Sequence, residues 1–219
     1  MRVRQHYDDQ LLALHNEVVN LGRLVVTAVT QALEALATNN LELAREVRAA
    51  DLRVNQAQQT LESHAFLLIA TQQPVARDLR SILSAIAVGS ELERIGDYAK
   101  GIAQFVIGPD GPPTLQPPAE LLELGAVAVE VLRQALTALE ALDATLARAV
   151  GAREEQVDQL YDKVIALLSD NLAHDKESAP RAADLLFITH NLERISDRAT
   201  NIAERVIFHT TGQTVELNP

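Results

Sequence analysis

Hydrophobic residues recur every three or four positions along most of the chain, with polar residues between them. Near its start, this spacing places Leu11, Leu14, Val18, Leu21 and Val25 on one side of a helix. The alternation of apolar and polar residues that marks a β-strand is hard to find. The pattern therefore predicts an all-α fold made of long amphipathic helices.

Turn residues divide this pattern into six helical segments. The strongest interruption is the run 108–118, whose five prolines no regular helix tolerates. We expect Pro74 to open the third helix and Ser178 to cap the sixth. Long helices joined by short turns favour antiparallel neighbours in a bundle. The expected helices cover residues 8–38, 41–71, 74–106, 119–150, 152–174 and 180–209.

The third and sixth expected helices carry an internal repeat. The segment 92–103 matches the segment 192–203 at eight of twelve positions, an offset of 100 residues. A weaker match relates the stretch from Asp51 to Asn55 to the stretch from Glu154 to Asp158. The sequence therefore predicts a tandem duplication of a three-helix bundle. The expected organisation is a first repeat at 1–107, a linker at 108–118 and a second repeat at 119–219.

Composition narrows the possible functions. The chain has a formal net charge of −11, which disfavours a broad electrostatic grip on nucleic acid. It contains no cysteine, which excludes disulfides, thiolate zinc sites and iron–sulfur ligation. No run of eighteen uncharged apolar residues and no apolar signal region are found, so we expect a soluble, intracellular protein.

Paired carboxylates stand out within the repeat. Glu93 and Asp97 lie one helical turn apart, and their mean direction is roughly 160° from the apolar stripe of their helix. Glu193 and Asp197 repeat the pair, and two such carboxylates can hold one hard cation or bridge two. The alternative is a solvated acidic face that binds nothing. Repetition at equivalent positions favours a metal site.

Other residues near these pairs allow more than one interpretation. His190 shares a face with the second acidic pair and is either an added ligand or a surface histidine. Arg94 and Arg194 either orient the carboxylates, bind phosphate or form ordinary helix salt bridges. The sequence contains no glycine-rich phosphate loop, Ser/His/Asp set or nucleotide fingerprint. We therefore do not expect an enzyme of a conventional kind.

The duplicated Leu-Glu-Arg-Ile-Gly/Ser-Asp motif, the run at 73–80 and the Asn-Ile-Ala-Glu run at 201–204 resemble the PhoU family. The resemblance spans nearly the whole chain and implies two three-helix bundles side by side, commonly in a homodimer. It also implies a cytoplasmic accessory protein that negatively regulates phosphate uptake and phosphate-starvation signalling. The implied partners are the ATPase subunit of the phosphate ABC transporter and a membrane sensor histidine kinase, which would recruit the protein to the inner face of the membrane.

Some members of that family hold multinuclear metal clusters through Glu/Asp-x-x-x-Asp pairs. Matched position by position, the resemblance implies the following pairs as metal ligands in this chain: Asp51 and Asn55, Glu93 and Asp97, Glu154 and Asp158, and Glu193 and Asp197. Asn55 replaces a carboxylate by an amide, and Gln104 departs from the Asn-Ile-Ala-Glu ending of the second repeat. We therefore expect the second site to bind better. An oxygen-rich ligand set admits Mg, Mn, Fe or Zn.

The main hypothesis is a metal-binding adaptor that couples phosphate transport to signalling through protein–protein contacts. One alternative is a metal-dependent phosphoester hydrolase that uses paired carboxylates and a bound water. Another is a metal-free helical scaffold whose acidic pairs bind nothing.

Overall fold

The computed structural model of the chain describes residues 2–108, 116–174 and 179–218. Within these residues the secondary structure is helical and contains no strand, which confirms the predicted all-α class. The helices are α1 (Arg2–Thr38), α2 (Leu41–Gln72), α3 (Ala76–Ile107), α4 (Ala119–Ala141), α5 (Ala144–Val150), α6 (Glu154–His174) and α7 (Ala179–Thr211), with a 3-10 turn at Gly151–Arg153. None of the described helices is long and apolar enough to cross a lipid bilayer.

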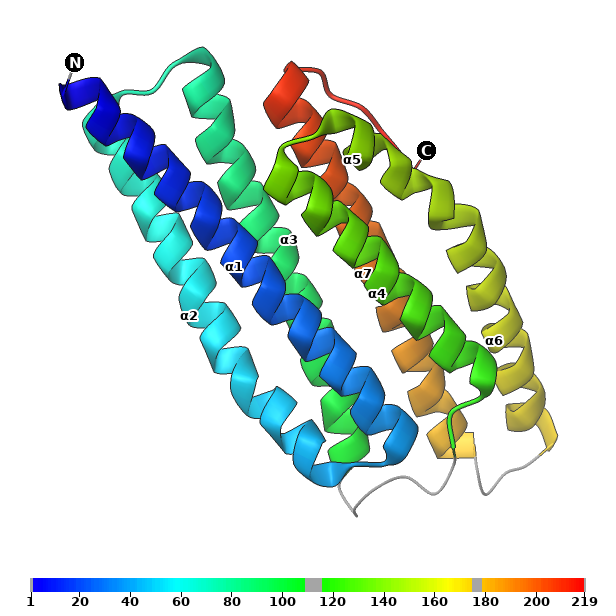
Figure 1. Ribbon diagram of the computed structural model, residues 1–219. Helices are drawn as coiled ribbons and strands as arrows, with labels where there is room; N and C mark the ends of the chain where they lie inside the picture. Colours follow the sequence, from blue (N-terminus) through cyan, green and yellow to red (C-terminus); the bar gives the residue numbers. More distant parts are fainter. Residues whose placement is uncertain (1, 109–115, 175–178, 219) are drawn as a thin grey trace.

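The six long helices form two three-helix bundles side by side (Figure 1). Helices α1, α2 and α3 make the first, and α4, α6 and α7 make the second, with the short α5 packed against α4 and α7. The bundles meet where α3 contacts α7 and α1 contacts α4. Of the expected linker at 108–118, residues 109–115 lie outside the described part of the chain.

The first helix begins at Arg2, six residues before its predicted start, and two further helix ends differ from the prediction. The predicted fourth helix, 119–150, stops at Ala141 because Leu142 adopts a left-handed conformation with φ of 50°. The Asp143 side chain then accepts hydrogen bonds from the backbone of Thr145 and Leu146, which starts α5 as a separate helix. The turn at Leu142 and the Asp143 cap therefore end one helix and start another, although the apolar pattern continues through this point.

The third helix begins at Ala76 rather than at Pro74 as predicted. Gln73 ends α2 in a left-handed conformation, and Val75 is extended, so Pro74 belongs to the turn between the helices. The expected cap at Ser178 lies outside the described residues.

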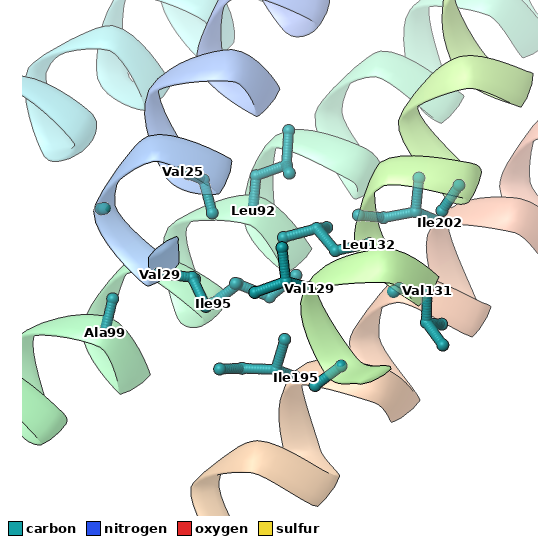
Figure 2. Close-up of a cluster of buried hydrophobic side chains, with 14 of the residues drawn as sticks. Val25, Val29, Leu92, Ile95, Ala99, Val129, Val131, Leu132, Ile195 and Ile202 are labelled. Carbon is teal, nitrogen blue, oxygen red and sulfur yellow. The ribbon is translucent and has the colours of Figure 1, made fainter. Parts of the chain in front are cut away.

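The core is aliphatic and continuous across the two bundles. The stripe predicted for the third helix, which includes Leu92 and Ile95, is fully buried, and its copy, which includes Ile195, is buried to the same extent. Figure 2 shows Val25 of α1 and Leu132 of α4 close to these α3 and α7 side chains. The two halves therefore share one core.

Glycines allow close approach at the joint between the halves. A Cβ atom added to Gly22 would lie 2.6 Å from Leu136 Cδ2, and one added to Gly125 would lie 2.6 Å from Leu33 Cδ2. The glycines are equivalent residues of the two repeats, and so are the leucines, with an offset of 103 residues. Each half therefore offers a glycine to the leucine of the other, and α1 and α4 run antiparallel.

We expect Gly125→Leu to reduce the free energy of unfolding by about 1–3 kcal/mol, because the added side chain displaces Leu33 from this joint. Ala126→Leu, at the exposed neighbouring position, is the matched control and should change stability by no more than about 0.5 kcal/mol. Urea denaturation measures both, and equal midpoints would show that this contact is not tightly packed.

Candidate functional site

Each half brings its candidate ligands together where its second and third helices face one another. The carboxylates of Asp51 and Asp97 both act on Glu93, which places the α2 and α3 groups in one electrostatic neighbourhood. In the second half, the carboxylates of Asp158 and Asp197 act in the same way on Glu154. The structure therefore gathers each predicted set from two helices.

The first half already contains a cation within its acidic set. Lys100 Nζ lies 2.6 Å from Oδ2 of the buried Asp51 and 3.5 Å from Oδ1 of Asp97, so the ammonium joins α2 to α3. The Asn55 amide donates a hydrogen bond to the same Asp51 oxygen at 3.3 Å. Asp51 Oδ1 and Asn55 Oδ1 are buried and have no hydrogen-bond partner among the described residues.

A second cation lies on the same helices. Arg48 Nη1 of α2 donates a hydrogen bond to Gln104 Oε1 of α3 at 3.3 Å. Gln104 is the residue that stands where the second repeat has Glu204. The donor set in this half therefore has one carboxylate fewer than that of the second half and already holds an ammonium ion, so it fits a multivalent metal ion less well.

The second half surrounds a small cavity with acidic groups. Glu154, Asp158 and Asp197 line one side of a space of about 10 Å³, together with the hydroxyl-bearing Ser196 and Thr200. The rest of its lining is apolar and consists of Val131, Val150 and Val157. That volume is close to the room a single water requires. Ser196 is 6% exposed, and its hydroxyl has no hydrogen-bond partner in the part of the chain that is described. Hard oxygen donors around an ion-sized space fit a metal such as Mg, Mn, Fe or Zn.

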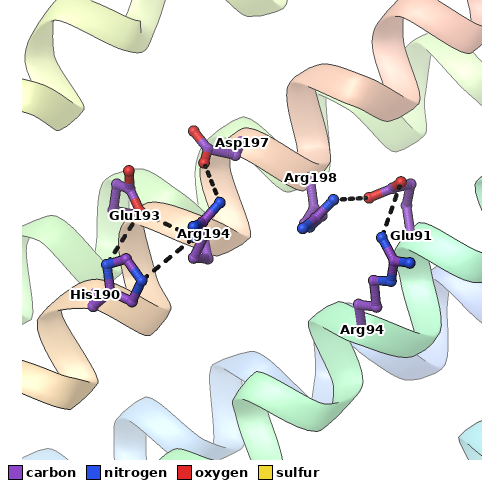
Figure 3. Close-up of polar contacts among 7 residues, drawn as sticks. All are labelled: Glu91, Arg94, His190, Glu193, Arg194, Asp197 and Arg198. Atoms are coloured by element: carbon purple, nitrogen blue, oxygen red, sulfur yellow. Dashed lines mark hydrogen bonds and ion pairs between the residues drawn. The ribbon is translucent and has the colours of Figure 1, made fainter.

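Glu193 and Asp197 are flanked by long ionic contacts (Figure 3). Arg194 lies 3.7 Å from Asp197 Oδ2 and 3.9 Å from Glu193 Oε2, and the half-exposed His190 lies 3.7 Å from the same Glu193 oxygen. These separations are longer than hydrogen bonds. Glu193 Oε2 is consequently a buried carboxylate oxygen without a hydrogen-bond partner among the described residues.

The equivalent arginines of the two repeats have different contacts. Arg194 faces its acidic pair, whereas Arg94 Nη1 lies 3.9 Å from Glu91 Oε1 on the preceding turn. Glu91 also binds Arg198 of α7, at 3.2 Å, across the joint between the halves (Figure 3). The ordinary salt-bridge interpretation thus describes Arg94, and the orienting role remains open only for Arg194.

Burial and mutual repulsion act on the carboxylates of both halves. Burial raises the pKa of Glu93, Glu154 and Glu193, and neighbouring carboxylates raise the pKa of each further. Burial also raises the pKa of Asp197, although Arg194 and Arg198 act in the opposite direction. Ionising these groups at neutral pH therefore carries an electrostatic cost.

Two residues in these neighbourhoods escaped the prediction from sequence. Lys100 enters the first set through a contact with a residue 49 positions away. Glu204 raises the pKa of Glu154, and its Oε1 accepts a hydrogen bond from the Leu217 backbone at 2.8 Å. A comparison of the two repeats could have identified both residues, because Lys100 aligns with Thr200 and Gln104 aligns with Glu204.

The side chains as placed do not form a closed coordination shell. Over residues 2–108, 116–174 and 179–218, no group of three Asp, Glu or His side chains converges closely enough to hold a metal ion. Metal binding in the second half would therefore require Glu193 or its neighbours to turn toward the cavity. Glu154, Asp158 and Asp197 already line this cavity, whereas Glu193 lies outside its lining.

Known proteins resemble the chain over nearly its whole length. A family model described as the PhoU domain matches it twice, at residues 18–106 and 121–206. A relative from Streptococcus pneumoniae, named phosphate-specific transport system accessory protein PhoU homolog, is 32% identical over 99% of this chain and 100% of its own length.

Two solved structures share the fold. The crystal structure of PhoU from Pseudomonas aeruginosa aligns with a TM-score of 0.89 at 30% identity, covering 94% of this chain and 100% of that one. The crystal structure of the phosphate transport system regulatory protein PhoU from Streptococcus pneumoniae aligns with a TM-score of 0.83 at 30% identity, covering 96% and 99%. The family model matches both halves of the chain, and the relative from Streptococcus pneumoniae is 32% identical over 99% of it. The chain therefore belongs to the PhoU family.

Proposed function

We propose that this protein is a cytoplasmic accessory and negative regulator of phosphate uptake and phosphate-starvation signalling, and that it works as a metal-binding adaptor. The name of the Streptococcus pneumoniae relative, an accessory protein of a phosphate-specific transport system, supports the transport role. The observation that carries the metal role is the cavity of about 10 Å³ lined by Glu154, Asp158 and Asp197.

In this proposal Glu154, Asp158, Glu193 and Asp197 hold the metal ion. The ion supplies positive charge to carboxylates that burial and repulsion make costly to ionise. Because the ligands come from α6 and α7, a bound ion also ties these two helices together. The residues themselves position the ion.

Exposed apolar side chains support the adaptor role. Phe66 is 59% exposed, and other large apolar residues on α2, in the following turn and on α3 are similarly accessible. The exposed apolar residues of α2, of the turn after it and of α3 are Leu52, Phe66, Leu67, Val75 and Leu83. In this proposal they contact the partner proteins. The proposed partners are the ATPase subunit of the phosphate ABC transporter, a membrane sensor histidine kinase and a second copy of the chain.

A capture experiment tests the adaptor role. Immobilised protein, loaded with Mn²⁺ or treated with EDTA, should retain the purified transporter ATPase and the purified sensor kinase. Phe66→Ser with Leu67→Ser should weaken retention at least tenfold, because both side chains are exposed and their loss leaves the core intact. Leu146→Ser, at an exposed apolar position in the other half, is the control. Retention of neither partner under either condition would reject the adaptor role.

The second candidate is the phosphoester hydrolase, because a metal ion held by the carboxylates that line this cavity would activate a water molecule. Turnover of a phosphate monoester by the Mn²⁺-loaded protein, abolished in Glu193→Ala, would support hydrolysis. Under the adaptor proposal we expect no turnover above the background of that variant. Elemental analysis of the same samples distinguishes the metal-binding adaptor and the hydrolase, which both contain metal, from a metal-free scaffold.

We expect Glu193→Gln to raise the melting temperature of the EDTA-treated protein by about 1 °C at pH 7, because it removes a repelled charge. The folded-state pKa of Glu193 is raised, so its stabilising protonated form is lost as pH increases above the ordinary value of 4.5. The difference between the variant and the natural sequence should therefore vanish as pH falls below 4.5. Thermal denaturation across this range measures it, and a lower melting temperature for the variant at pH 7 would contradict the electrostatic argument.

A further inference from the structure

We propose that the first half carries its own permanent cation, the Lys100 ammonium, where the second half takes a metal ion. The chain would then have one metal centre, in the second half, rather than two. This inference rests on the metal role proposed above and determines which residues perform it.

The ammonium occupies the place that a metal would need. Lys100 Nζ contacts Asp51 of α2 at 2.6 Å and Asp97 of α3 at 3.5 Å, so it connects the same two helices that a metal would join. The equivalent residue of the second repeat is Thr200, which is 6% exposed and lines the cavity. A lysine side chain thus reaches between the acidic groups in one half, and a cavity of about 10 Å³ adjoins them in the other.

A metal ion and this ammonium are mutually exclusive on electrostatic grounds. A cation bound to the Asp51 carboxylate lies roughly 2.0–2.6 Å from its oxygen. Since Lys100 Nζ is 2.6 Å from Asp51 Oδ2, the two positive charges would be separated by only a few ångströms. At that distance, in a partly buried site, their repulsion opposes metal binding strongly.

The remaining differences between the repeats act in the same direction. The first half has Asn55 where the second has Asp158, and Gln104 where the second has Glu204. Gln104 is further held by the cationic Arg48. Each change removes a negative charge or adds a positive one, so the first half attracts an external cation less strongly than the second. Two acceptor oxygens there remain unpaired among the described residues, and releasing Lys100 would expose them to a metal: Asp51 Oδ1 and Asn55 Oδ1.

The two halves should therefore respond differently to metal. In the first, the lysine joins α2 to α3 whatever the metal concentration. In the second, the contact between α6 and α7 includes carboxylates with raised pKa values and no lysine among them. Metal-dependent changes in stability and shape should be confined to α6 and α7.

Reciprocal exchange of the two residues tests the proposal. Each protein is saturated with Mn²⁺ and desalted, and bound manganese per chain is measured by elemental analysis. Thr200→Lys should reduce bound manganese at least tenfold and make the melting temperature independent of Mn²⁺. Lys100→Thr should bind at least as much manganese as the natural sequence, because removing the ammonium leaves the second-half site unchanged and exposes acceptor oxygens in the first half. Its lowered melting temperature in EDTA should be raised by Mn²⁺. Lys163→Thr, which removes an exposed lysine of α6, should match the natural sequence in both measurements.

Paired amide substitutions test the same proposal in case the Thr200→Lys protein does not fold. Glu193→Gln with Asp197→Asn should remove the bound manganese, whereas Glu93→Gln with Asp97→Asn should leave it unchanged. Two results would overturn the single-centre assignment while leaving the metal role intact. One is a halving of bound manganese when Glu93 and Asp97 are replaced by amides. The other is an unchanged manganese content in a folded Thr200→Lys protein. Natural protein that retains no manganese would overturn both.

Discussion

The structure depends on the burial of α3 and α7 in a core shared by both bundles. Each of these helices packs in its own bundle and also against the other, so their aliphatic stripes are fully removed from water. Burial of this kind is the main favourable term in folding. It also restricts where charge can lie: the carboxylates of the acidic sets lie beside the second helix of their own bundle, and Glu91 of α3 is paired with Arg198 of α7. The position of the acidic sets therefore follows from the core.

Much of the fold could be predicted from local patterns in the sequence. Apolar residues at helical spacing identify the stripes, and the match between 92–103 and 192–203 identifies the duplication. Helix ends were less predictable where a single side chain decides them. The break at Leu142 depends on Asp143 capping the next helix, and the apolar pattern continues through this point without a signal. The start of α3 likewise depends on the backbone around Pro74.

The candidate sites were predictable only as far as one helix determines them. Two carboxylates a turn apart share a face in any helix, so Glu193 and Asp197 could be paired from sequence. The contact of Lys100 with Asp51 depends on the packing of α2 against α3, and no periodicity within one helix contains it. The hydrogen bond from Leu217 to Glu204 similarly depends on the path of the chain after α7.

The glycine–leucine joint between α1 and α4 has a further consequence. Gly22 receives Leu136 and Gly125 receives Leu33, so each half presents the same patch to the other, as identical subunits do in a two-fold dimer. In a dimer of identical chains, a lysine that fills one acidic site would fill both. In one chain that carries both halves, the two sites need not be identical. The charged residues of one half can change without those of the other, while the glycine–leucine contacts keep their symmetry. The duplicated chain can therefore combine a site with a built-in ammonium and a site left open, within one approximately symmetric frame.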